Sequence, residues 1–346
     1  MNNCSQAPQT DATRAAAERY LDSWNTSGMD WDAWMAEVAL AKGAFAKLIG
    51  AAPSDVAVFG SVSAAASAVA SALDLDGARR RIVVSEMEFP GVAHVWLAQG
   101  RRAAQVCYDA PIDERTALVS ACHGWYVNGF VQDVKDIAAR ARTAGALSFV
   151  DAYQTLGAVP VNVRELGVDF LATGALKFLM GVPGIAFLYV RPEIVESLRP
   201  MATGWFGRVD PFAFDAQTLD WSPNASRFDA GTPPVLNAYI ARAGMEIIND
   251  VGPAKIRAWH EVLARRLIDG GRARGLELHG TDDVSHKTAT TAFVVPDSHG
   301  VEAAMRARGV LPSARGPVIR LAPHFYNTLD DVDRALDTLA DVIHAR

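Results

Sequence analysis

The stretch from residue 146 to residue 190 constrains the fold of this chain most. It opens on an apolar run that ends in Asp151. A second apolar run, residues 168–173, leads to Lys177, which has no charged neighbour within six residues on either side. A third run follows over residues 185–190. Short apolar runs separated by turn residues are typical of the buried strands of an α/β sheet.

The acid and the lysine in this stretch form a chemical pair. Apolar surroundings disfavour a charged amine, so the pKa of Lys177 should fall and its amine should become nucleophilic. Pyridoxal phosphate (PLP) needs a lysine for its Schiff base and an acid beside its pyridinium nitrogen. The pair therefore predicts a PLP site with Lys177 and Asp151 as catalytic residues. Taken alone, each residue has a structural alternative: Asp151 could cap a helix and Lys177 could lie at a core edge.

Strand-like and helix-like segments alternate from residue 56 to residue 190. Such alternation predicts a mostly parallel sheet with helices on both faces. Small residues at positions 60–63 lead into an Ala-rich helical segment, where free backbone N–H groups could bind a phosphate. The turn lacks the glycine patterns of nicotinamide and nucleotide sites. The alternative is an ordinary strand-to-helix turn capped by serine.

Five segments resemble the class V aminotransferase family of fold-type I PLP enzymes, which includes kynureninases, cysteine desulfurases and isopenicillin-epimerase-like proteins. They occur in family order, and they are VDAYQ, TGALK with GVPGIAFLYV, GWFG, RFDAGTPP and IRLAPHFYNT. The resemblance implies PLP fold type I, a mostly parallel sheet sandwiched by helices, with a smaller α+β C-terminal domain. We expect a large PLP-binding domain over residues 13–235 and a small domain over residues 236–346, with the arm 1–12 packing on the latter.

The resemblance also implies cofactor contacts outside the acid–lysine pair. Most relatives place a Ser and a His just before the lysine to bind the cofactor phosphate, whereas this chain has Gly174, Ala175 and Leu176 there. The phosphate must then depend on other groups. The predicted contacts are Ser61, Val62, Ser63 and Thr173 for the phosphate, Tyr126 and Gln154 for the ring hydroxyl, Phe89 and Trp205 beside the cofactor, and Thr232 from a dimer partner.

Arg320 lies in an expected strand, Val318 to Leu321, before the segment PHFYNT. A planar guanidinium can bind a carboxylate with two parallel hydrogen bonds. The resemblance implies that Arg320 binds the α-carboxylate of an amino-acid substrate. The alternative is a surface ion pair.

Two departures from the desulfurases bear on the reaction. Phe89 stands where desulfurases have a ring-stacking histidine, and a phenyl ring can stack but cannot transfer a proton. The chain also has no cysteine beyond Cys122 to serve as a persulfide carrier. We therefore predict a kynureninase-like or C–S lyase-type β-elimination or hydrolysis. His123 could be the acid–base group or a structural donor. Open alternatives are an aminotransferase or epimerase of the same family, and a catalytically idle binding protein.

Composition limits the partners and the compartment. A net charge of −6 provides no basic stripe for nucleic acid. Three scattered cysteines predict neither a disulfide framework nor a metal site and suit a reducing cytoplasm. The first residues show no signal peptide, and the most apolar long stretch, residues 56–75, is broken by one glycine and four serines. We expect a cytoplasmic homodimer with its active site at the subunit interface and no membrane contact.

Overall fold

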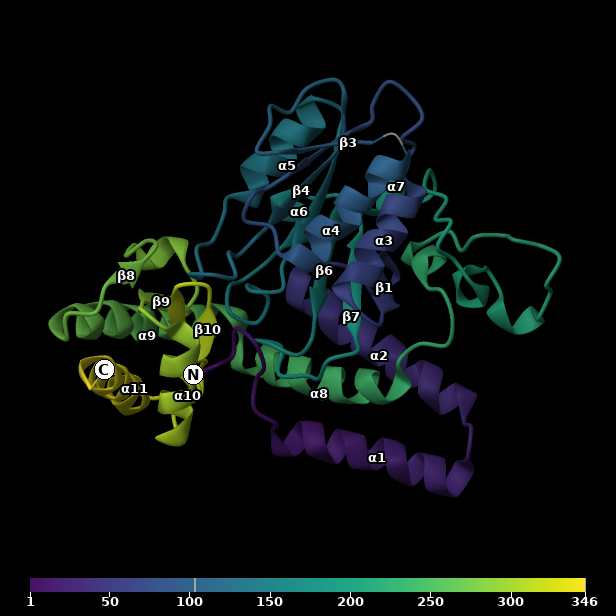
Figure 1. Ribbon diagram of the computed structural model, residues 1–346. Helices are drawn as coiled ribbons and strands as arrows, with labels where there is room; N and C mark the ends of the chain where they lie inside the picture. The colour runs from purple at the N-terminus through teal and green to yellow at the C-terminus, as the bar shows by residue number, and fades with distance from the viewer. Residues whose placement is uncertain (103, 346) are drawn as a thin grey trace.

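A computed structural model describes residues 1–102 and 104–345, and it contains two sheets (Figure 1). The larger sheet has the order β1-β7-β6-β5-β4-β2-β3. Only β7 runs antiparallel to its neighbours, so the predicted mostly parallel sheet is confirmed. Its strands are β1 (Val56–Phe59), β2 (Arg81–Val84), β3 (Gln105–Tyr108), β4 (Thr116–Cys122), β5 (Leu147–Asp151), β6 (Phe170–Gly174) and β7 (Ala186–Val190).

Helices cover both faces of this sheet because successive side chains of each strand point to opposite sides. On β5, Phe149 packs against Trp96 in the core beside α3 and α4, while Val150 joins the core beside α2 and α8. The helices of this part are α1 (Asp11–Ser27), α2 (Trp31–Ile49), α3 (Val62–Ala72), α4 (Pro90–Ala98), α5 (Val134–Thr143), α6 (Val163–Leu166), α7 (Pro192–Val195) and α8 (Val235–Val251). In the part of the chain that the structure describes, no helix is long and apolar enough to cross a bilayer.

The smaller sheet is antiparallel and has the order β10-β11-β9-β8. Its core joins Phe293 and Ile319 of the strands to Leu267 and Leu336 of two helices. The strands are β8 (Leu278–His279), β9 (Thr291–Val294), β10 (Ser313–Arg315) and β11 (Val318–Leu321), and the helices are α9 (Pro253–Ala273), α10 (Ser298–Ala307) and α11 (Leu329–His344). Residue 346, where the predicted small domain ends, lies outside the described residues.

The helix α8 packs with the large domain, although the sequence-based boundary at residue 235 assigns it to the small one. Met245 shares a core with Phe45 of α2, and Arg242 binds Glu37 of α2 at 2.6 Å. We therefore propose that the domain boundary lies at Gly252, whose positive φ of 93° separates α8 from α9.

The N-terminal arm lies between the two domains. Asn3 donates from its backbone N–H and from its side-chain amide to the carbonyl of Ala322, just after β11. A few residues later, the N–H of Ala7 donates to the carbonyl of Leu176, next to Lys177. The arm thus contacts β11's C-terminal end in the antiparallel sheet and also the loop that carries the lysine.

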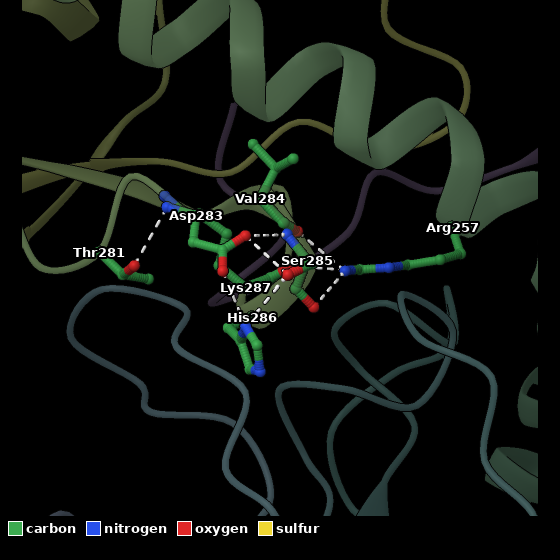
Figure 2. A network of polar contacts seen from close by, with 7 residues as sticks. All are labelled: Arg257, Thr281, Asp283, Val284, Ser285, His286 and Lys287. Atoms are coloured by element: carbon green, nitrogen blue, oxygen red, sulfur yellow. Dashed lines mark hydrogen bonds and ion pairs between the residues drawn. The ribbon is translucent and has the colours of Figure 1, made fainter.

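A polar network holds the segment 281–287 of the small domain on α9 (Figure 2). The guanidinium of Arg257 donates to the carbonyls of Val284, Ser285 and Lys287. The same segment then pairs with the large domain, because Val131 donates its N–H to the carbonyl of His286 at 2.8 Å. The small domain therefore supports the loop of residues 124–131, which contributes one wall of the candidate site.

Candidate active site

A cavity of about 330 Å³ opens at the carboxyl ends of β4, β5 and β6, in front of the N-terminus of α3. Open α/β sheets bind ligands at this edge. The register of the sheet places Cys122, Asp151 and Ala172 side by side there. The lining residues are Gly60, Ser61, Val62, Ser63, Phe89, Gly91, Val92, Cys122, Gly124, Tyr126, Asp151, Tyr153, Gln154, Leu176, Lys177, Pro183, Gly184 and Ile185.

Lys177 projects its amine into this cavity between two aromatic rings. Its Nζ lies 4.2 Å from the ring centre of Tyr153 and 5.6 Å from that of Phe89. Burial lowers the pKa of Lys177 to about 8, against the opposing charge of Asp151. The amine is therefore neutral in a large fraction of molecules at mildly alkaline pH, as a nucleophilic lysine requires.

Asp151 lies at the end of β5 with a second buried acid near it. Its Oδ1 accepts the N–H of Tyr153 at 2.8 Å, which fixes the carboxylate, while burial raises the pKa of Asp151. The second acid, Glu88, accepts hydrogen bonds from Ser120 Oγ and the Phe89 N–H. Burial, and then the charge of Asp151, raises the pKa of Glu88 to about 8. The charge of Lys177 opposes this rise for Asp151, whereas no cation among the described residues lowers the pKa of Glu88.

The first turn of α3 offers donors to an anion. The N–H groups of Val62 and Ser63 have no partner among the described residues, as expected for the first turn of a helix. Ser61 caps the helix by accepting the Ala64 N–H at 3.1 Å. Ser63 donates its hydroxyl to the carbonyl of Gly91 at 2.7 Å, so that hydroxyl proton is already used. Backbone groups and Ser61 are therefore what this turn can offer a phosphate.

Two aromatic rings and an amide form the remaining wall. Phe89, 37% exposed, meets Tyr126 edge to face at 5.2 Å between ring centres. Gln154 lies beside them and donates from its amide to the carbonyl of Cys4 in the N-terminal arm at 3.1 Å. These three predicted contacts all line the cavity.

Two predicted residues are buried behind the cavity and do not line it. The Nδ1 of His123 lies 2.9 Å from Thr155 Oγ1, and burial lowers the pKa of His123 to about 4. Thr173 donates its hydroxyl to the carbonyl of Gly174 at 3.1 Å. Both side chains make contacts within the protein itself, and for His123 this geometry favours the structural-donor alternative over the acid–base role.

Trp205 and Thr232 also lie away from this cavity. Trp205 packs edge to face on Trp31 at 5.7 Å and on Phe212 at 5.6 Å. Thr232 is exposed, between Gly231 and Pro233. Those two neighbours line a separate cavity of about 380 Å³ next to α2. Within one chain, neither predicted contact reaches Lys177.

Arg320 is buried beside the cavity, with 1% of its surface exposed. Its two terminal nitrogens donate to the carbonyl of Tyr126 at 2.5 Å, to Ser313 Oγ at 2.5 Å and to Ser5 Oγ at 3.2 Å. Its Nε is buried without a partner. A buried donor left unpaired in a folded protein calls for an explanation, and a ligand is one.

The fold and the cavity define an enzyme class, and comparison with known proteins identifies the family. The profile of "Aminotransferase class-V" matches residues 7–334. The chain is 36% identical to the uncharacterized aminotransferase YcbU of Bacillus subtilis (strain 168), over 98% of this chain and 92% of that protein. It is 28% identical to a kynureninase of Burkholderia mallei (strain SAVP1), over 99% of this chain and 88% of that protein.

A solved structure of a C-DES variant with glycine covalently linked to its PLP cofactor has the same fold. It matches with a TM-score of 0.89 at 17% identity, over 98% of this chain and 95% of that one. The chain therefore belongs to the class V aminotransferase family of PLP-dependent enzymes.

The groups that line the cavity fit this family's cofactor. They combine a buried amine of lowered pKa, a buried carboxylate at a strand end and a helix N-terminus with free N–H groups. Lys177 would hold the cofactor covalently, Asp151 would face its ring nitrogen, and the α3 turn would bind its phosphate. The sequence reasoning missed Tyr153, which lines the cavity, and Glu88, a buried acid that interacts with Asp151. The sequence signal that could have indicated Tyr153 is its position two residues after the predicted acid, Asp151.

Replacing Lys177 by Ala should abolish covalent attachment of the cofactor. In the wild type, borohydride reduction followed by peptide mass spectrometry should find PLP on the peptide that contains Lys177. The rate of attachment should rise with pH and level off above about 8, because the neutral amine is the reactive form.

The matched control is Lys287→Met. Among the described residues, Lys287 is a second lysine whose pKa burial lowers to about 8, and it does not line the cavity. That variant should label like the wild type. Labelling of Lys177→Ala at any other lysine would show that the site has been assigned wrongly.

Proposed function

We propose that this enzyme binds PLP and breaks a bond at Cβ of a small amino acid, by elimination or hydrolysis. The main support for this proposal is that the ring of Phe89 lies next to Lys177, while the imidazole of His123 contacts Thr155. No imidazole lines the cavity among the described residues. The similarity to kynureninase over nearly the whole chain supports the same class of reaction.

One base is sufficient for this chemistry. PLP, when bound, supplies an electron sink for the electron pair left on the substrate Cα. Lys177 Nζ can take the Cα proton and later return it to the product. Asp151 would hold the proton of the ring nitrogen, and the charge on that nitrogen would in turn favour ionised Asp151. Tyr126 and Tyr153 also line the cavity, and their hydroxyls could donate protons there.

Transamination is the second candidate, because the relative at 36% identity is named an aminotransferase. It uses the same amine to move a proton from Cα, so Lys177 and Asp151 serve both reactions. Two-base epimerisation has less support, since it needs a second base opposite the lysine, and Phe89 stands next to the lysine instead. The fate of the substrate Cβ separates the candidates.

Screening the holoenzyme with individual amino acids should distinguish these reactions by their products. We expect pyruvate or alanine to be released from a substrate with a leaving group or acyl group at Cβ, without any added keto acid. Mass spectrometry and a coupled dehydrogenase assay measure both products. A keto acid formed only when an acceptor keto acid is supplied would instead establish transamination.

We propose further that Arg320 anchors the substrate α-carboxylate. Its Nε is the one guanidinium nitrogen without a partner among the described residues, and a carboxylate that accepted from Nε could also take the place of Ser5 Oγ, 3.2 Å from a terminal nitrogen. A ligand bound there would satisfy the donor that the protein leaves unpaired. Arg315 lies on the same strand face, because it is two residues from Ser313, the cross-strand partner of Arg320. It adds positive charge near the site.

Arg320→Lys should therefore raise KM and lower kcat together, because it keeps the charge but removes the fork. We expect kcat/KM to fall roughly 10- to 100-fold, on the basis of about 1.5–3 kcal/mol for a charge-assisted hydrogen bond. Arg315→Lys is the control on the exposed neighbour and should change kcat/KM much less. If Arg320→Lys changed kcat/KM by less than about twofold, the substrate carboxylate would have to bind elsewhere.

We also propose a cytoplasmic homodimer in which Thr232 reaches the partner's cofactor phosphate. The segment 201–221 supports this, since it exposes large apolar side chains, including Phe214 at 74%, as interfaces between subunits do. Thr232 follows the same segment, is exposed, and lies outside the cavity of its own chain. All three cysteines are free, which fits a reducing compartment.

Sedimentation should give the mass of a dimer, and Thr232→Val should leave that mass unchanged while weakening PLP binding. The control, Thr218→Val, changes an exposed threonine of the neighbouring segment and should not affect PLP binding. A monomer that keeps full activity on dilution would exclude a shared active site.

A further inference from the structure

Gly174 and Tyr153 share one space beside the cofactor cavity. A Cβ atom added at Gly174 would lie 2.1 Å from the hydroxyl oxygen of Tyr153, much closer than two unbonded atoms can approach. Position 174 is the end of β6, three residues before Lys177. A glycine is therefore required there because the tyrosine hydroxyl already occupies the place where a side chain would begin.

That place is where a phosphate donor is missing. The Ser and His that most relatives carry just before the lysine are absent, and Leu176 offers no polar group in the position nearest the lysine. Two other expected hydroxyls are used by the protein, since Ser63 donates to Gly91 and Thr173 donates to Gly174. The hydroxyl of Tyr153 makes no hydrogen bond within residues 1–102 and 104–345, and the residue lines the cavity.

We propose that the Tyr153 hydroxyl is a ligand of the cofactor phosphate and does the work of the polar side chains that most relatives carry just before the lysine. This proposal rests on the proposed binding of PLP. The donated hydrogen bond would add to those from the Val62 and Ser63 N–H groups at the start of α3. The glycine at position 174 makes room for this arrangement, because any side chain there would displace the ring of Tyr153.

The surroundings of Tyr153 suit a donor to an anion. Burial and the charge of Asp151 raise the pKa of Tyr153, so its phenol keeps the proton that it would donate. Its ring packs against the core cluster that includes Val62 and Ala65 of α3, the helix that would bind the same phosphate. Its backbone N–H holds Asp151 at 2.8 Å. One residue thereby connects the carboxylate expected at the ring nitrogen with the group expected at the phosphate.

Tyr153→Phe tests the hydroxyl alone, with PLP and phosphate-free pyridoxal as the two probes. Titration of the apoprotein, followed by absorbance and fluorescence, gives the dissociation constant of each. We expect the constant for PLP to rise roughly 10- to 100-fold, as for loss of one charge-assisted hydrogen bond. The constant for pyridoxal should stay within about twofold, because pyridoxal has no phosphate to lose a contact. Equal effects on both probes, or no effect on PLP, would overturn the proposal.

A serine at position 174 provides the rescue. Gly174→Ser alone should weaken PLP binding because its Cβ collides with the tyrosine. The double variant Tyr153→Ala with Gly174→Ser opens that space and should recover a large part of the preference for PLP over pyridoxal that Tyr153→Ala alone loses. Failure of the double variant to regain any preference, with a melting temperature like that of Tyr153→Ala, would also count against the proposal.

Tyr126→Phe is the control, because it removes the other tyrosine hydroxyl of the cavity and should not change the preference for PLP over pyridoxal. The wild type separates this test from that of the proposed function. A wild type that binds no PLP refutes the cofactor itself, whereas a wild type that prefers PLP without help from Tyr153 refutes only the phosphate ligand. The reaction catalysed does not enter the measurement.

Discussion

Burial of one amine beside one carboxylate, at the carboxyl edge of a parallel sheet, is the constraint on which this structure depends. A lone buried charge is costly, and the pair reduces that cost only while the fold keeps both groups in place. Glu88 adds a third ionisable group to the same region and is held protonated, since its pKa is raised to about 8. The site thus brings one amine and two acids together, and the cationic ring of a bound cofactor would favour the ionised form of the acid that faces it.

The small domain contributes to this constraint through two buried histidines. His324 follows β11 and lies 2.9 Å, through Nε2, from the carbonyl of Phe178, the residue after Lys177. A carbonyl oxygen can only accept a hydrogen bond, so Nε2 of His324 is the donor. In a neutral imidazole the other nitrogen is then an acceptor, and Nδ1 of His324 accepts a hydrogen bond from Nε2 of His260 at 3.0 Å. Burial lowers the pKa of His324 to about 4, so His324 stays neutral at physiological pH. The contribution of this buried, neutral histidine to the stability of the fold is fully present above the ordinary histidine pKa and is lost as pH falls toward 4.

The sequence was most informative where local pattern and chemistry coincide. The strands ending in Asp151 and preceding Lys177, the turn at Ser61–Ser63 and the strand of Arg320 lie where apolar runs and turn residues place them. Contacts between distant segments could not be predicted in this way. Whether His123 faces the cavity or Thr155 depends on how two loops pack together. The attachment of α8 to the large domain depends on its contact with α2, because the periodicity of apolar residues shows that a helix has an apolar face but not which partner covers it.

The two departures from relatives that surround the lysine have different physical consequences. Phe89 in place of a histidine keeps a ring against the cavity but removes a proton carrier, so it narrows the chemistry without affecting how the cofactor is held. The absence of the Ser and His before the lysine removes phosphate donors, and a change of that kind would weaken cofactor binding if no other group took their place. The Tyr153 hydroxyl fills it, from a residue that is fixed by Asp151 and packed on the core that includes α3. The chain can therefore differ from its relatives beside the phosphate and still present a complete set of donors, because a side chain from the neighbouring strand end reaches the same point.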